Sequence, residues 1–146
     1  DALVVLRGHA EWVLGVTTLE VVTDEDLPRV VSCGDDGTVC VWNAVSGDAP
    51  VARKDHSRFV RDLAARVSND DRLLVVSCSQ SGWKDDGTIR MWDAHNTGGD
   101  ALVELKGHAG GVTGVTTLVV VHGEVRVVSC GNDGPVRMWA IEGGDA

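Results

Sequence analysis

Serine, histidine and aspartate recur together three times along this chain of 146 residues. His9, His56 and His108 are each followed by a Ser-Cys pair and then by an Asp-Gly pair. Nucleophilic catalysis needs a Ser beside a His that a carboxylate orients. A catalytic set is normally single, whereas this one is present in three copies, and we therefore expect it to serve architecture. A hydrolase that uses Ser, His and Asp is kept as a remote third alternative.

Four cysteines are the other candidates for chemistry. Cys33, Cys78 and Cys130 each follow the recurrent Ser, and their spacings of 45 and 52 residues lack the close pairs of a zinc site. Cys40 is expected roughly opposite Cys33 on an adjacent strand, so a disulfide is the alternative to the buried reduced thiols that we favour. The sequence also lacks a phosphate-binding loop and a calcium-binding loop. We therefore expect no metal and no cofactor.

The charge balance argues against several classes of partner. Lys and Arg total 13 against 22 Asp and Glu, which gives a formal net charge of −9. Binding to a phosphate backbone needs a surface rich in Lys and Arg, so we expect no nucleic-acid partner. A membrane partner is not expected either, because an anionic surface repels this charge and no apolar run approaches about 18 residues. The N-terminus lacks a signal-peptide pattern, and we expect a cytoplasmic protein.

An internal repeat sets the positions of these residues. Residues 2–22 match residues 101–121 at 15 of 21 positions, and a more diverged copy starts near Val51. Three tryptophans recur at intervals of 50 and 47 residues: Trp42, Trp92 and Trp139. A period of this length suits a four-stranded propeller blade. We expect a single array over 1–146, with repeats at approximately 2–50, 51–100 and 101–146.

The pattern within each repeat is that of short β-strands. In the first repeat the β-branched runs predict strands at Leu3–Leu6, Val13–Val22, Arg29–Cys33 and Val39–Trp42. The Asp-Gly pairs predict a hairpin with a type I′ turn between the last two strands of each repeat. No stretch has helical periodicity with caps. The predicted fold class is all-β, with three four-stranded antiparallel blades.

These motifs resemble those of the WD-repeat β-propeller family, three times over and across essentially the whole chain. The matching residues are Gly8-His9, Asp55-His56 and Gly107-His108, with SCGDDGTVCVWN (32–43), SCSQSGWKDDGTIRMWD (77–93) and SCGNDGPVRMWA (129–140). In that family a hydrogen-bonded tetrad of His, Ser, Asp and Trp holds each blade together. The resemblance implies structural tetrads at His9, Ser32, Asp36 and Trp42; His56, Ser77, Asp86 and Trp92; and His108, Ser129, Asp133 and Trp139. Pro135 replaces the usual Thr after the third turn, but no tetrad member is lost.

The aromatic residues outside the tetrads indicate a surface for a partner. In the resembled family, the inner strand begins around the central channel on one face, a few residues after each His, and the residue before the turn Asp faces the same side. The predicted partner-binding residues are Trp12, Leu14, Asp35, Phe59, Arg61, Trp83, Lys84, Asp85, Thr113 and Asn132. Exposed Trp and Arg are usual in binding hot spots. The alternative is that Trp12 and Phe59 pack against neighbouring blades.

Three blades are fewer than the four to eight that usually close a propeller. Residues 2–6 would form the outer strand of a preceding blade, and in the resembled family such a strand closes the ring. Here it could complete the last blade of a second chain, so we predict a homodimer with six blades. The competing explanation is that the chain is an excised piece of a longer array.

The resemblance implies a function as well as a fold. Members of this family are mostly platforms that assemble complexes or recognise peptides, so we expect a non-catalytic scaffold with a protein or peptide partner. The alternative is a purely structural repeat segment of a larger multidomain WD-repeat protein.

Overall fold

The chain is built from strands that pair only with their near neighbours in sequence. A computed structural model describes residues 2–20, 27–47, 51–54, 56–57, 59–79, 87–95 and 100–141. Within them, three antiparallel sheets form, and we call these blades 1, 2 and 3. Blade 1 contains β1 (Val13–Leu19), β2 (Arg29–Gly34), β3 (Val39–Asn43) and β4 (Val51–Arg53). Blade 2 contains β5 (Val60–Val67), β6 (Leu73–Ser79), β7 (Ile89–Asp93) and β8 (Val103–Leu105), and blade 3 contains β9 (Val112–Val119), β10 (Val125–Gly131) and β11 (Arg137–Ala140).

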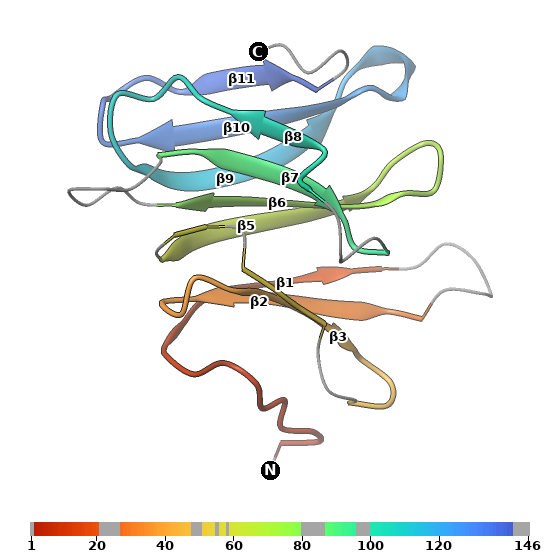
Figure 1. The fold of residues 1–146 in the computed structure, drawn as a ribbon. Coiled ribbons are helices and arrows are strands. Elements are labelled where there is room, and N and C mark those ends of the chain that lie inside the picture. The colour runs from red at the N-terminus through yellow and green to blue at the C-terminus, as the bar shows by residue number, and fades with distance from the viewer. Residues whose placement is uncertain are drawn as a thin grey trace.

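The three blades stack in chain order, with blade 2 in the middle (Figure 1). The prediction of an all-β fold made of propeller blades is confirmed. In the described part of the chain, the only helical segment is a short 3-10 turn at Val121–Gly123, and no helix is long and apolar enough to cross a membrane. The outer strand of each complete blade comes from the repeat that follows it, since β4 and β8 both lie just beyond the Trp of their blade.

The predicted strand Leu3–Leu6 is wrong for this chain. Residues 4–6 carry no strand assignment, whereas the equivalent residues 103–105 form β8. The difference follows from pairing, because a strand needs a neighbour to accept its backbone hydrogen bonds. β8 pairs with β7, but no strand lies beside residues 4–6 in the described structure.

The hairpin turns of blades 1 and 3 differ from the predicted type I′, and most of the blade 2 turn lies outside the described residues. That turn needs positive φ at both central residues, yet Asp35 and Asp36 are not among the residues with positive φ, and only Gly37 is left-handed at 76°. The Gly37 N–H donates to the Gly34 carbonyl over 3.2 Å, so the left-handed glycine comes after the turn. The loop therefore has an odd number of residues, and Cys33 pairs with Val39 while Cys40 pairs with Ser32.

This register corrects the expected position of Cys40 opposite Cys33. Residues one step apart in register point to opposite faces of a sheet. All four cysteines are free thiols, with Cys33, Cys40 and Cys78 buried and Cys130 exposed. Burial raises the pKa of the Cys33 thiol to about 12 and also raises that of Cys40. Reactive thiols need a lowered pKa, so these buried thiols are structural.

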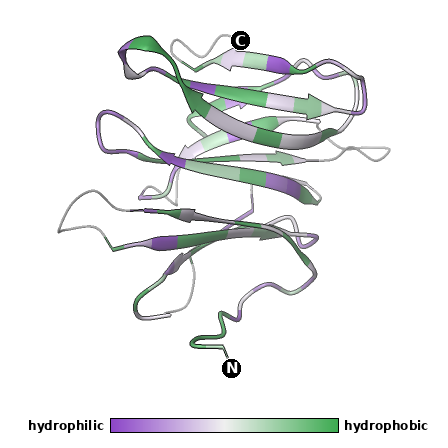
Figure 2. Cartoon of the chain, turned by 180° about the vertical axis from the view of Figure 1, so that it is seen from behind, coloured by the Kyte–Doolittle hydropathy of each residue, from purple (hydrophilic) through white to green (hydrophobic). Residues whose placement is uncertain are grey.

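Two hydrophobic cores lie between the blades and hold the stack together. Val31, Val39 and Val41 of blade 1 pack against Leu63 and Trp92 of blade 2. In the same way, Ile89 and Met91 of blade 2 pack against Val115, Val127 and Trp139 of blade 3. Each fully buried side chain of this size contributes about 1.5–3 kcal/mol. Figure 2, which shows the chain from behind, has green hydrophobic segments in the strands of all three blades.

Candidate functional site

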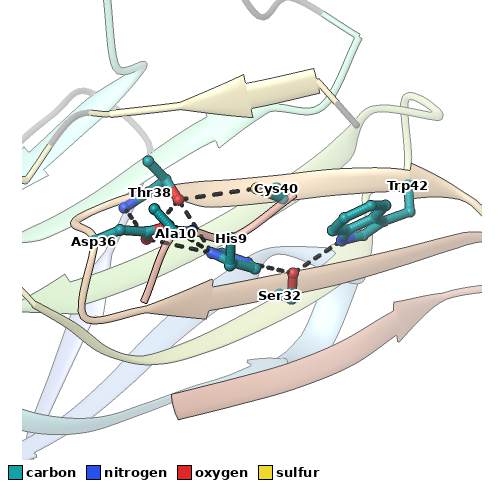
Figure 3. Close-up of polar contacts among 7 residues, drawn as sticks. All are labelled: His9, Ala10, Ser32, Asp36, Thr38, Cys40 and Trp42. Atoms are coloured by element: carbon teal, nitrogen blue, oxygen red, sulfur yellow. Dashed lines mark hydrogen bonds and ion pairs between the residues drawn. The ribbon is translucent and has the colours of Figure 1, made fainter. Parts of the chain in front are cut away.

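The first unit joins its His, Ser, Asp and Trp in one hydrogen-bonded chain (Figure 3). The Trp42 indole N–H donates to Ser32 Oγ over 2.9 Å, and Ser32 Oγ lies 2.7 Å from His9 Nε2. His9 Nδ1 lies 3.0 Å from Asp36 Oδ2. A carboxylate only accepts, so the Nδ1 proton belongs to His9 and the Ser32 hydroxyl donates to Nε2. Every member of the chain is thereby satisfied.

Asp36 receives more hydrogen bonds than the tetrad alone supplies. The Ala10 N–H donates to Oδ2 over 3.0 Å, and the Thr38 hydroxyl donates to Oδ1 over 2.6 Å. Burial acts to raise the pKa of Asp36, but the bonds from Thr38, Ala10 and His9 outweigh it and lower the pKa below its usual value. The carboxylate therefore ties three segments of blade 1 together in its charged form.

The third unit repeats this geometry. The Trp139 indole N–H donates to Ser129 Oγ over 2.8 Å, and Ser129 Oγ lies 2.8 Å from His108 Nε2. His108 Nδ1 donates to Asp133 Oδ1 over 2.7 Å and lowers the pKa of that carboxyl. Pro135 occupies the position of Thr38, which donates hydrogen bonds to Asp36 in the first unit. In the third unit Arg137 Nη2 donates to Asp133 Oδ2 over 3.2 Å instead.

The middle unit departs from the other two. His56 Nε2 lies 2.9 Å from Ser77 Oγ, and Asp86 lies outside the described residues. The indole N–H of Trp92 is buried and has no hydrogen-bond partner among the described residues. The Arg53 guanidinium stacks over the Trp92 ring at 5.2 Å, which joins the outer strand of blade 1 to blade 2 through a cation–π contact.

The serines of these units lie inside the structure and are hydrogen-bonded to the histidines. Ser32, Ser77 and Ser129 are all buried. In the first and third units one lone pair of the Ser oxygen already accepts the indole N–H. A nucleophile must reach its substrate with a free lone pair. No group of three or more potential metal ligands occurs in the described part of the chain either.

The predicted partner-binding residues that the structure describes lie at one end of the inner strands. Trp12 and Phe59 immediately precede β1 and β5, and both are exposed, at 77% and 42%. The Asp35 N–H donates to the Trp12 carbonyl over 2.9 Å, and the Asn132 N–H donates to the Gly111 carbonyl over 3.0 Å. We name this set the aromatic surface: Trp12, Leu14, Asp35, Phe59, Arg61, Thr113 and Asn132. Trp83, Lys84 and Asp85 lie outside the described residues.

A β-bulge occurs at the same place in every blade. The pairing skips Leu14 between Val13 and Gly15, and it skips Arg61 between Val60 and Asp62. In blade 3 the pairing skips Thr113 between Val112 and Gly114. A bulge re-aims the side chain of the extra residue and is common beside functional sites. Three members of the aromatic surface are thus presented by an irregularity of the inner strands.

Asp62 was not predicted from the sequence, although it forms a hydrogen bond between two blades. Its Oδ2 accepts the Val115 N–H over 3.1 Å, so a carboxylate of blade 2 bonds to the inner strand of blade 3. The equivalent residues in the other units are Gly15 and Gly114. The replacement of a repeated Gly by Asp is the signal that could have identified it.

A cavity lined by described residues lies away from the aromatic surface. It has a volume of about 560 Å³ and is lined by the loops at 68–72 and 122–124 with Leu74 and Met91 beneath. These loops join the opposite ends of the inner strands. No member of the aromatic surface lines this cavity, and Trp12 and Phe59 are exposed instead.

Antiparallel blades, stacked through apolar faces and carrying a His-Ser-Trp network in the first and third units, define a propeller-type repeat protein. The family described as "WD domain, G-beta repeat" matches residues 1–43, 50–93 and 99–140. The chain belongs to this family, and the resemblance seen in its sequence is confirmed.

Three relatives of this chain are much longer than the chain itself. It is 30% identical over 150 residues to the nuclear distribution protein PAC1 of Yarrowia lipolytica, a match covering 95% of the chain and 30% of that protein. It is 26% identical over 137 residues to telomerase protein component 1 of Rattus norvegicus, covering 90% of the chain and 4% of that protein. The SIR4-interacting protein SIF2 of Saccharomyces cerevisiae is 32% identical over 74 residues, or 51% of the chain and 12% of that protein. The chain thus spans less than a third of these relatives.

Proposed function

We propose that this chain is a non-catalytic interaction scaffold that binds a protein or peptide through the aromatic surface, and that it works as a homodimer. Membership of the WD-repeat family supports a role in protein interaction. The observation that carries the finer proposal is the 77% exposure of Trp12 beside a bulged strand. Trp12 shares its surface with the exposed Phe59 and with Arg61, and exposed aromatic and Arg side chains gathered on one surface are typical of sites that bind proteins.

The charges around Trp12 and Phe59 suit a partner of mixed, net basic character. Glu11 and Asp35 flank Trp12, and Arg61 follows Phe59 on the adjacent inner strand. The whole chain carries a net charge of −9, which favours the approach of a basic segment. We propose a peptide with an apolar anchor flanked by Lys or Arg, bound in the cytoplasm, where the four free thiols stay reduced.

A selection from a random 12-residue phage-display library tests this function. We expect the protein to enrich peptides with apolar anchors beside basic residues. Binding of a selected peptide should weaken at least about tenfold in the double variant Trp12→Ala and Phe59→Ala, since anchors of this kind contribute about 2 kcal/mol or more. The melting temperature should stay within a few degrees, because both side chains are exposed.

Val121→Ala is the matched control, because Val121 is 76% exposed at the other end of the strands. It should leave peptide binding unchanged. If the double variant instead melts far below the wild-type protein, Trp12 and Phe59 belong to the core. If no peptide is enriched, the alternative of a purely structural segment of a larger WD-repeat protein is favoured.

A further inference from the structure

The cavity of about 560 Å³ lies inside the stack, at the junction of blades 2 and 3. Apolar side chains from both blades line it, namely Leu74, Met91, Leu102, Val103, Val125 and Ile141. Leu74 and Met91 are buried, whereas Leu102 is exposed. Cavities that bind small molecules have volumes of about 300–1,000 Å³, with mostly apolar walls and a few polar groups. This cavity has the size and the lining of such a site.

The junction of blades 1 and 2 holds a cavity of only about 280 Å³ at the equivalent place. Arg29 lines it where Leu74 lines the larger cavity, and these two residues are equivalent because each lies opposite the residue after the repeated Trp. Ala94 likewise stands where Ile141 stands in the next repeat. The two junctions share one fold, so the wider and more apolar cavity is a property of the residues at the second junction.

Two loops at the mouth of the larger cavity hold each other in place. Asn69 Nδ2 donates to the His122 carbonyl over 3.4 Å, which links the β5–β6 loop of blade 2 to the β9–β10 loop of blade 3. A Cβ on Gly123 would overlap Asn69 Nδ2, so this approach requires glycine. In the described part of the chain, Asp71 and His122 are the non-glycine residues with left-handed φ, at 60° and 70°. Backbone strain of this kind is common where a ligand is held.

The charged side chains at the mouth are paired with one another. Arg72 Nε lies 3.0 Å from Asp70 Oδ2, and Arg126 Nη2 donates to Glu124 Oε2 over 2.7 Å. These two ion pairs cancel, in a chain whose net charge is −9. A charged ligand would meet only paired Arg, Asp and Glu side chains among the described lining residues, and it would lose water above an apolar floor. The lining therefore favours an uncharged ligand.

We infer that the cavity between blades 2 and 3 binds a small, uncharged and largely apolar molecule that carries a hydrogen-bonding group. The apolar body of the ligand covers Leu74 and Met91, and its polar group reaches the rim, where Ser68 and Asn69 lie. The site needs neither the aromatic surface nor a second copy of the chain. The inference therefore goes beyond the proposed function.

Binding of N-phenyl-1-naphthylamine tests this site. The probe is uncharged and mostly apolar, it carries an N–H group, and its fluorescence rises in apolar surroundings. We expect saturable binding of one molecule per chain. Leu102→Glu should weaken the binding at least about tenfold, because the probe would bury the new carboxylate. Leu27→Glu is the matched control and should leave the affinity unchanged, since Leu27 is 46% exposed, against 44% for Leu102, and does not line the cavity.

Methionine NMR locates the probe in the wild-type chain. The chain has two methionines, of which Met91 lines the cavity and Met138 does not. With isotope-labelled methyl groups, the ring currents of the bound probe should shift the Met91 signal and leave the Met138 signal in place. Met138→Leu assigns the two signals.

The inference is overturned if the probe does not bind, or if the Met91 signal stays in place or shifts no further than that of Met138. Equal affinities of Leu102→Glu and Leu27→Glu would also overturn it. The double variant Trp12→Ala and Phe59→Ala should bind the probe as the wild type does, and Leu102→Glu should still bind the selected peptides. Failure of this site and failure of the proposed function are therefore distinguishable.

Discussion

At the scale of single residues, the serine oxygen is the centre of each complete tetrad. Ser32 Oγ accepts from Trp42 and donates to His9, and both partners lie inside blade 1. Removing that oxygen leaves an indole N–H and an imidazole nitrogen without a partner. The cost of a buried polar group left unsatisfied exceeds the net worth of the bond itself.

Ser32→Ala should therefore lower the free energy of unfolding by about 1–3 kcal/mol. Denaturation in urea measures this change. Ser57→Ala is the control, because Ser57 is exposed, and it should alter stability by less than about 0.5 kcal/mol. Equal stabilities of the two variants would show that the tetrad does not hold the blade.

The tetrad carboxylates should make the fold sensitive to acid. The pKa values of Asp36 and Asp133 are lowered in the folded chain. A lowered pKa stabilises the fold fully above the unfolded value of about 3.9, and this contribution is lost as the pH falls through the folded pKa. The stability difference between the wild type and a variant with Asp36→Asn and Asp133→Asn should therefore shrink as the pH is lowered below about 4.

Denaturation curves between about pH 3 and 7 measure that difference. Asp71→Asn provides the matched control, since Asp71 is an exposed residue of the β5–β6 loop. A gap that stays constant across this range would contradict the assignment of these carboxylates.

At the scale of elements, the repeat predicted most strands but not their exact pairing. Val39–Trp42 and Arg29–Cys33 are strands within one residue of the expected bounds. The type I′ turn predicted between them is wrong. The pair Asp-Gly fits a type I′ turn, but it also fits a loop in which a left-handed glycine follows the two central residues of the turn. The two loops differ in register by one residue, so Cys40 pairs with Ser32 and not with Cys33 as predicted.

A glycine in the equivalent turn of blade 3 allows a test of this geometry. Gly134 has a φ of 100°, and a Cβ there would meet nothing within 4 Å, so any cost of Gly134→Ala comes from the backbone. We expect a loss of about 1 kcal/mol in urea denaturation. Gly110→Ala should cost less, because its Cβ would make only an ordinary contact at 3.7 Å with Asn132. The reverse order would contradict the left-handed conformation.

Features that break the repeat were harder to predict than features that follow it. The tetrad residues recur at fixed positions, so a single sequence reveals them by self-comparison. Asp62 replaces a repeated glycine, and its bond to Val115 depends on how two blades meet. Residues 4–6 have the sequence of a strand, but a strand also needs a pairing neighbour, and none lies beside them among the described residues.

At the scale of the whole molecule, the described stack exposes apolar side chains at both ends. Blade 2 is covered on both faces, whereas blade 1 exposes Val16 and blade 3 exposes Val136 and Met138. Burying such side chains stabilises an assembly by about 25 cal/mol per Å² of apolar area. In the homodimer that we propose, the exposed faces of the two copies would cover each other, and the assembly would carry two aromatic surfaces.

The mass of the folded chain in solution tests this account most directly. Light scattering at micromolar concentration, on protein whose circular dichroism shows β-structure, should give twice the mass of one chain. The mass should fall to that of one chain for Met138→Glu and stay doubled for Val121→Glu. A wild-type chain that remains folded at the mass of a single copy would contradict the closed dimer.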